Sequence, residues 1–122
     1  MNEPLVSSTV RPCLQGPADL PEFVTSTFDA VELQRDDQGD DHAHVVLRVG
    51  DSVIEVDAGS TAPGIWPAAA TLRVQVADAD ATLARALAAG ATTLAPVQAR
   101  GTERRGAFID AGGNTWWVVS SA

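Results

Sequence analysis

The second half of this 122-residue chain repeats the pattern of its first half. A shift of 62 positions places HVVLRVGDSVIEVDA (44–58) on GAFIDAGGNTWWVVS (106–120), so that Gly50 falls on Gly112 and Val56 on Val118. Few residues are identical, so the evidence for the repeat lies as much in the shared order of elements and turns as in the identities. A unit of this kind covers one face of its sheet with its own helix, and the other face must curve around something else.

Hydrophobic periodicity and turn residues predict a strand, a helix and three further strands in each half. In the first half, the predictions are a strand at 8–15, a helix at 18–30, a strand at 30–35 and a hairpin at 42–57. In the second half, they are a strand at 71–76, a helix at 78–90, a strand at 91–97 and a hairpin at 101–120. The glycines and prolines of residues 58–69 predict a connector between the halves.

Charge narrows the choice of partners. Sixteen Asp and Glu residues stand against eight Arg, and the formal net charge is −8. Such a balance argues against nucleic acid or an anionic membrane as a partner, because both repel an acidic surface. Cationic or neutral small molecules fit better. The alternative is that the acidic surface serves only to keep the protein soluble.

Three features of the sequence are typical of a cytoplasmic protein. Cys13 stands alone, so no disulfide can form within the chain, and we expect it to be a small core residue. The N-terminal MNEPLVSSTV lacks the basic start and the apolar run of a signal peptide. No stretch approaches the roughly 20 apolar residues of a membrane span. We therefore expect a cytoplasmic location and no membrane partner.

Four stretches carry a resemblance to a known family: FDAVELQR (28–35), HVVLRVGDSVIEV (44–56), VADADATLARALAAGATTL (76–94) and RRGAFIDAGGNTWWV (104–118). In this order and spacing the chain resembles the vicinal oxygen chelate superfamily, which includes glyoxalase I, extradiol dioxygenases and the bleomycin-resistance proteins. The last stretch looks like the family's arginine–glycine–(aspartate-proline)–glycine ending, with Ala111 in place of the usual proline.

The resemblance covers nearly the whole chain and implies an α+β fold. Two tandem βαβββ modules would form a curved, cup-shaped mixed sheet with the helices on its outer face. Residues 1–122 would be one domain, with module one at about 8–57, the connector at 58–69 and module two at about 70–120.

The resemblance also bears on metal binding. In metal-dependent members, the first and last strands of each module together supply four ligands, mostly His and Glu, in the cup. Glu55 falls at one of these positions and Trp117 at its counterpart, while Thr9 and Thr71 fall near the other two. A hydroxyl is a poor ligand beside imidazole or carboxylate, and an indole cannot ligate at all. We therefore expect the metal-free branch and no cofactor.

One alternative keeps a metal in the site. His42 and His44 are spaced i and i+2, which puts both on one face of a strand, a common arrangement for metal ligands. Glu55 with either histidine is therefore a weak candidate metal site, although the family does not draw its ligands from that strand.

The adjacent Trp116 and Trp117 must point to opposite faces of their strand. Trp117 shares the phase of Glu55, so we expect Trp117 in the cup and Trp116 on the helix side in the core. An indole in the cup can stack on a flat or cationic ligand, and Glu55 can pair with a positive group. The alternative is that Trp117 is a core residue whose side chain fills the cup. Trp66, in the connector, would be a lid over the cavity or a plug at a dimer contact.

These observations favour a metal-free small-molecule binding protein that resembles the bleomycin-resistance proteins and sequesters a planar or cationic ligand in the sheet cavity, as in antibiotic resistance. The expected ligand-binding residues are Glu55, Trp117, Trp66, Thr9 and Thr71. The alternative is a glyoxalase-like lyase, isomerase or dioxygenase with Glu55 as metal ligand or general base. Members of the superfamily commonly pair so that modules of two chains complete each cavity, so we expect a homodimer.

Overall fold

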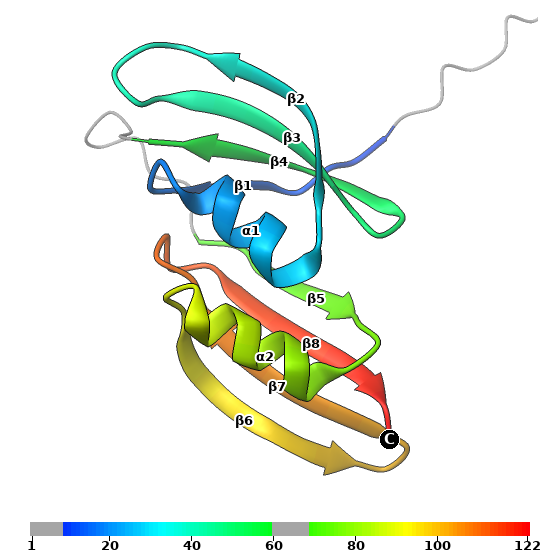
Figure 1. Ribbon diagram of the computed structural model, residues 1–122. Helices are drawn as coiled ribbons and strands as arrows, with labels where there is room; N and C mark the ends of the chain where they lie inside the picture. The colour runs from blue at the N-terminus through cyan, green and yellow to red at the C-terminus, as the bar shows by residue number, and fades with distance from the viewer. Residues whose placement is uncertain (1–8, 60–68) are drawn as a thin grey trace, which may run out of the picture.

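The computed structural model describes residues 9–59 and 69–122, and its elements follow the predicted order (Figure 1). The first module contains β1 (Cys13–Gly16), α1 (Leu20–Phe28), β2 (Val31–Asp37), β3 (Ala43–Val49) and β4 (Ser52–Ala58). The second module contains β5 (Thr71–Gln75), α2 (Ala79–Ala88), β6 (Thr92–Arg100), β7 (Glu103–Ile109) and β8 (Thr115–Ser121). The predicted pair of βαβββ modules is confirmed.

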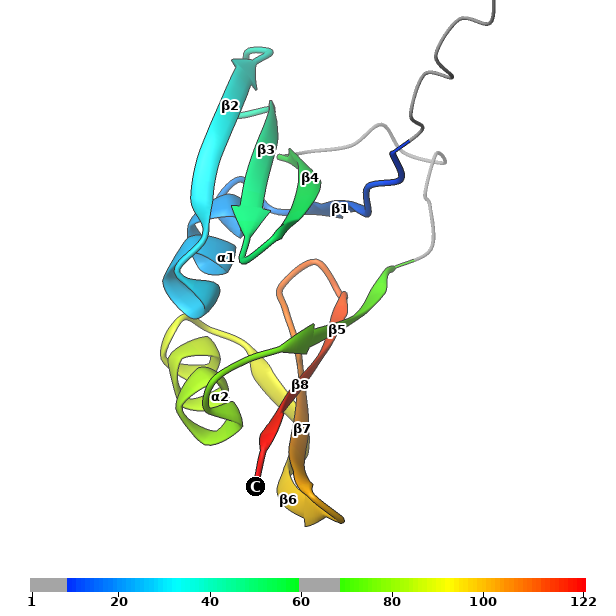
Figure 2. The same ribbon diagram turned by 90° about the vertical axis from the view of Figure 1, so that its right-hand side faces the viewer.

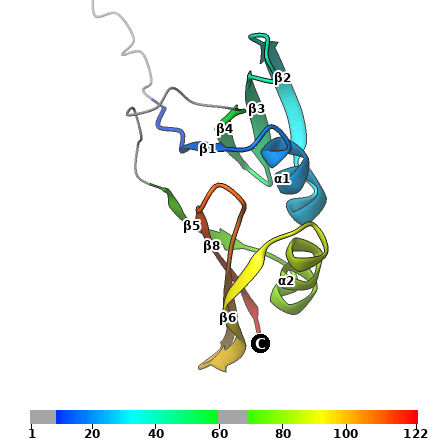
Figure 3. The ribbon, with the colours of Figure 1, turned by 90° about the vertical axis from the view of Figure 1, so that its left-hand side faces the viewer.

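The eight strands form two four-stranded mixed sheets with the same strand order, β1-β4-β3-β2 and β5-β8-β7-β6. In each sheet the first strand runs parallel to the last, and the other neighbours are antiparallel. Figures 2 and 3 show both helices on the same side of the two sheets. We call the opposite side of each sheet its open face. The edge strands β1 and β5 lie at the boundary between the modules (Figure 1).

The helices begin and end at recognisable signals. The Asp78 side chain accepts a hydrogen bond of 3.0 Å from the Ala81 amide, which caps α2. Helix α2 ends just before Gly90, whose φ of 105° is a left-handed conformation that glycine adopts without strain. Helix α1 has a proline in its first turn and ends at Asp29, in the left-handed region. Neither helix is long and apolar enough to cross a lipid bilayer.

The core continues from one module into the other through aromatic side chains of α1. The Phe23 ring lies 5.9 Å from the Phe108 ring, and the Phe28 ring lies 5.0 Å from the Trp116 ring. Trp116 and Phe108 are almost fully buried. Arg85 of α2 also donates to the Thr27 carbonyl at the end of α1. The first helix therefore packs on both modules.

The turn between β7 and β8 makes a second link between the modules. The Asn114 side chain donates to the Gln15 carbonyl in β1 and accepts from the Ala70 amide just before β5. A Cβ built on Gly112 would lie 2.4 Å from the Gln15 oxygen, so only glycine allows this approach. The close approach of this turn and its hydrogen bonds therefore hold β1 beside it.

The first strand is shorter than predicted. Residues 8–15 were expected to be extended, but β1 begins at Cys13. Pro12 has no amide hydrogen, so it can only accept, and its carbonyl takes the hydrogen bond from the Glu55 amide that starts the β1–β4 ladder.

Candidate functional site

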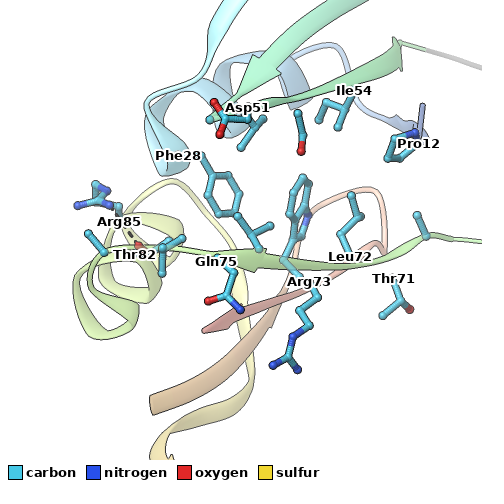
Figure 4. A pocket seen from close by; sticks show the side chains of 18 of the residues that line it. Pro12, Phe28, Asp51, Ile54, Thr71, Leu72, Arg73, Gln75, Thr82 and Arg85 are labelled. Carbon is cyan, nitrogen blue, oxygen red and sulfur yellow. Dashed lines mark hydrogen bonds between the residues drawn. The ribbon is translucent and has the colours of Figure 1, made fainter. Parts of the chain in front are cut away.

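A cavity of about 900 Å³ lies between the two modules (Figure 4). Module one contributes Pro12, Phe28, the β3–β4 turn and Ile54, and module two contributes the whole of β5 and the start of α2. This volume falls in the range of small-molecule sites, which are mostly apolar with a few polar groups.

The cavity wall combines apolar side chains with exposed backbone. Phe28 and Leu72 project into the space below Ile54 in Figure 4, and Trp116 also lines the cavity. The side chains of Arg73 and Gln75 point away from the cavity (Figure 4), yet both residues line it. Their backbone therefore forms this part of the wall.

The rim carries charged groups from both modules. Asp51, in the exposed β3–β4 turn, lines the cavity from module one, and Asp78, just before α2, lines it from module two. Arg85 also lines it, but its guanidinium donates to the Thr27 carbonyl and to the Thr82 hydroxyl. The side chain of Arg73 points away and lies 3.7 Å from Glu103. The rim groups left for a ligand are therefore the Asp51 carboxylate and the Asp78 oxygen that does not cap α2.

A second group of polar side chains lies on the open face of the first sheet. The β3–β4 hairpin pairs His44 with Asp57 and Val46 with Glu55. The His44 Nδ1 lies 2.7 Å from an Asp57 oxygen, and its Nε2 lies 2.6 Å from a Glu55 oxygen. Arg11 lies 3.4 Å from the other Glu55 oxygen.

The contacts of His44 favour its charged form. A neutral imidazole has only one N–H, whereas both ring nitrogens of His44 face carboxylate oxygens, so only imidazolium donates to both. The hydrogen bond with Asp57, and next the one with Glu55, raise the pKa of His44 above its ordinary value.

The raised pKa of His44 predicts a pH-dependent contribution to stability. Because the folded-state pKa lies above the unfolded one, the stabilisation is complete below about pH 6.5 and is lost as the pH rises through the folded-state pKa. We expect the melting temperature of the wild type to exceed that of His44→Gln at pH 6, and the difference to shrink as the pH is raised to 9. The control is His42→Gln. A difference that grows with pH would contradict the assignment.

Cys13 does not lie in the core, contrary to expectation. Alternation along β1 buries Leu14 and places Cys13, which is exposed, on the open face. Its sulfur lies 3.7 Å from an Asp57 oxygen. Partial burial, and next the charge of Asp57, raise the pKa of the Cys13 thiol, so it stays protonated at neutral pH.

The open face of the second sheet carries Trp117. This side chain is half-buried, and its register partners are Arg73 on β5 and Ala107 on β7. Trp116 is buried on the helix side, where its Nε1 donates to Asp110 over 2.8 Å. The predicted orientation of Trp116 is confirmed. A role of Trp117 in ligand binding stays a prediction.

The structure places the other expected site residues as follows. Thr71 is the first residue of β5 and lines the cavity, whereas Thr9 is exposed before β1. His42 lies in the turn before β3, where its backbone bonds to Gln38 and Gly39. Trp66 lies outside the described residues. Glu55 is not among the residues that line the cavity. The binding roles of these residues therefore stay predictions.

The metal that the resemblance implies does not fit the donor set of one chain. Register places Cys13 beside Glu55 and Arg73 beside Trp117 on the strands that would hold it. Guanidinium and indole groups cannot coordinate a cation. Within residues 9–59 and 69–122, no group of three or more His, Cys, Asp or Glu side chains is placed to hold a metal ion.

Sequence reasoning missed Asp57, and it placed the cavity in the cup of the sheet rather than between the modules. Asp57 could have been found, because counting outward from the Gly50–Asp51 turn places it opposite His44. No short sequence pattern predicts a cavity at this place. Its walls come from Phe28, Ile54 and Leu72, which read as ordinary core residues of three separate elements.

Neither a scan against protein-family models nor a search of curated proteins found a match. Solved structures do resemble the chain. TioX from Micromonospora sp. ML1 is 21% identical, with a TM-score of 0.70 over 94% of this chain and 97% of its own. FosX, a genomically encoded fosfomycin resistance protein from Listeria monocytogenes, is 16% identical, with a TM-score of 0.69 over 97% and 96%. A gene product from Arabidopsis thaliana is 20% identical, with a TM-score of 0.68 over 96% and 100%.

The chain therefore shares its fold with TioX and FosX, and the α+β fold class that the sequence predicted is confirmed. At these identities, the likeness shows the fold alone.

Proposed function

We propose that this protein binds and sequesters a small molecule in the cavity between its modules, without a metal. The ligand would combine a planar apolar part with a positively charged group. The observation that carries this proposal is the cavity of about 900 Å³ walled by Phe28, Ile54, Leu72 and Trp116.

The apolar part of the ligand is inferred from the wall. Phe28 and Leu72 are only half-buried, so a ligand against them removes further apolar surface from water. An aromatic wall favours a flat partner, because stacked rings gain energy beyond simple burial. The positive group is inferred from Asp51 and Asp78 on the rim, together with the net charge of −8.

We expect the planar cation proflavine to quench the tryptophan fluorescence of the protein, with an affinity that falls as salt rises. Leu72→Ala removes three carbon atoms from the apolar wall and should weaken binding about three- to tenfold, because a ligand would cover this half-buried side chain only in part. The matched control is Leu33→Ala, because Leu33 is 48% exposed on β2 and does not line the cavity. Equal effects of the two substitutions would place the site elsewhere.

A charge reversal tests the preference for a cation. Asp51→Lys replaces an attractive rim charge with a repulsive one, which should weaken proflavine binding by about three- to tenfold. Asp36→Lys makes the same change in net charge at an exposed residue of β2, outside the cavity lining, and should have little effect.

We also propose that the chain forms a homodimer in which the open faces are completed by the second copy. Of the residues expected to bind the ligand, Thr71 lines the cavity, whereas Glu55 and Trp117 lie on the open faces and would contact a ligand only at the face that the second copy completes. The half-buried Trp117 supports this, because a large indole on an open face is a common interface residue. Light scattering at micromolar concentration should give twice the mass of one chain. A mass of one chain would contradict the pairing.

The alternative is a glyoxalase-like lyase, isomerase or dioxygenase with Glu55 as general base or metal ligand. The arrangement of Glu55 speaks against it. One carboxylate oxygen accepts from His44 and the other from Arg11, so neither is free to take a proton from a substrate without breaking an ion pair.

A further inference from the structure

The edge strand β5 presents unpaired backbone groups along its outer side. Ala70 accepts a hydrogen bond from the Thr115 amide, and the Val76 amide donates to Val119, both on or next to β8. In a parallel pair, backbone groups that face the neighbour alternate along the strand. The N–H and C=O groups of Thr71, Arg73 and Gln75 therefore face away from β8.

These same residues line the cavity through their backbone. Their side chains point away from it (Figure 4), and all three are among its lining residues. Across the part of the chain that the structure describes, β5 pairs with β8 alone, and no other backbone bond is formed by these three residues. Their free groups are spaced by about 6.6 Å, the repeat of alternate residues in a strand.

We propose that the ligand of the cavity is an extended, amide-bearing molecule whose amides pair with the free edge of β5 as an added strand would. This inference rests on the proposed function and names its ligand class. The backbone groups of two alternate residues of an extended, peptide-like ligand match the groups of Arg73 and Gln75, while a planar group reaches Phe28 and Leu72. A positive group at one end would lie near the rim carboxylates.

The chemistry of the edge distinguishes such a ligand from a simple planar cation. A buried N–H or C=O that gains no partner costs free energy, so a ligand that covers β5 without pairing would bind poorly there. A ligand with secondary amides gives hydrogen-bond partners to the free backbone groups of β5 and finds partners there for its own amide groups. N-methylation of those amides removes the donor and leaves the size and charge nearly unchanged.

The first experiment compares three probes: the acetylated and amidated tripeptide Lys-Trp-Val, the same tripeptide methylated on every backbone nitrogen, and proflavine. We expect the unmethylated tripeptide to bind about tenfold or more tightly than its methylated form. In amide exchange followed by NMR, it should slow the Arg73 and Gln75 amides, which lie on the free edge. The Leu72 and Val74 amides, already bonded to β8, should change little.

The second experiment removes one donor from the edge. Arg73→Pro removes the backbone N–H that faces the cavity and no ladder bond, a position where an edge strand tolerates proline. Arg73→Ala is the matched control, because both variants lose the contact with Glu103 and only one loses the N–H. Arg73→Pro should bind the tripeptide about three- to tenfold more weakly than Arg73→Ala, with proflavine affinity equal in the two. If Arg73→Pro does not fold, Gln75→Pro against Gln75→Ala gives the same comparison.

Three results would overturn the proposal. If proflavine binds in the cavity while the two tripeptides bind equally, or the edge amides are unaffected, the proposed function stands and the amide class is wrong. If neither proflavine nor a tripeptide binds, both fail. If the Arg73 and Gln75 amides already exchange slowly in the ligand-free protein, a second copy occupies the edge.

Discussion

Replacing Trp116 with alanine is expected to lower the free energy of unfolding by roughly 3–5 kcal/mol, as loss of a buried tryptophan does. Trp116 is 1% exposed, and its ring lies 5.0 Å from Phe28 and 6.3 Å from Phe108. The substitution also removes the indole N–H that donates to the Oδ2 atom of Asp110. The same change at the adjacent Trp117 should cost only about 1 kcal/mol, because that side chain is half-buried on the open face.

Urea denaturation of the two single variants measures this difference directly. Ligand titration adds a second readout. If a ligand contacts Trp117 on an open face completed by a second copy, Trp117→Ala should weaken its binding by about ten- to a hundredfold, the loss of a stacking surface worth about 1–3 kcal/mol. Should Trp117→Ala unfold the protein while Trp116→Ala leaves it stable, the orientation of β8 described above would be wrong. If neither variant changes binding, Trp117 has no part in the site.

Replacing Asp110 with alanine is expected to destabilise the protein by roughly 3–5 kcal/mol, because two buried donors, the Asn114 backbone amide and the Trp116 indole, lose their only acceptor. Asp110 is 5% exposed and accepts from the amides of Gly112 and Asn114 and from the side chains of Asn114 and Trp116. The amide of Asn114 and the Trp116 indole lie in the interior, where water cannot replace the carboxylate.

Thermal and urea unfolding of Asp110→Ala tests this expectation, with Asp51→Ala as the control, since Asp51 lies in an exposed turn. Asp51→Ala should change the free energy of unfolding by less than about 0.5 kcal/mol. Equal stability of Asp110→Ala and the wild type would show that the hydrogen bonds around Asp110 add nothing net. The effects of Asp110→Ala and Trp116→Ala should not be additive, because each removes the same Asp110–Trp116 contact.

Much of the fold could be predicted because its signals are local. The turn at Gly50–Asp51, the cap at Asp78 and the alternation around Trp116 and Trp117 each depend on a few neighbouring residues. The start of β1 was less predictable. It depends on the hydrogen bond from the Glu55 amide to the Pro12 carbonyl. These two residues are 43 positions apart in the sequence, so no local pattern predicts their contact.

The site was harder to predict because it depends on how the modules pack. The open-face position of Glu55 follows from alternation within β4, and the ion pair with His44 follows from the hairpin register. The cavity instead requires Phe28, at the end of α1, to meet the second module. No sequence periodicity specifies that approach, since it is set by the three-dimensional fit of two helices and two sheets.

The double role of Phe28 and Trp116 would limit how the proposed binding specificity can evolve. Both side chains line the cavity and also hold the two modules together. A mutation there that suited a new ligand would lower stability at the same time, a trade-off common at functional sites. Leu72, Asp51 and Ser52 line the cavity outside that aromatic contact. Changes in ligand preference are therefore expected to accumulate at the rim and on β5, over an aromatic wall that stays fixed.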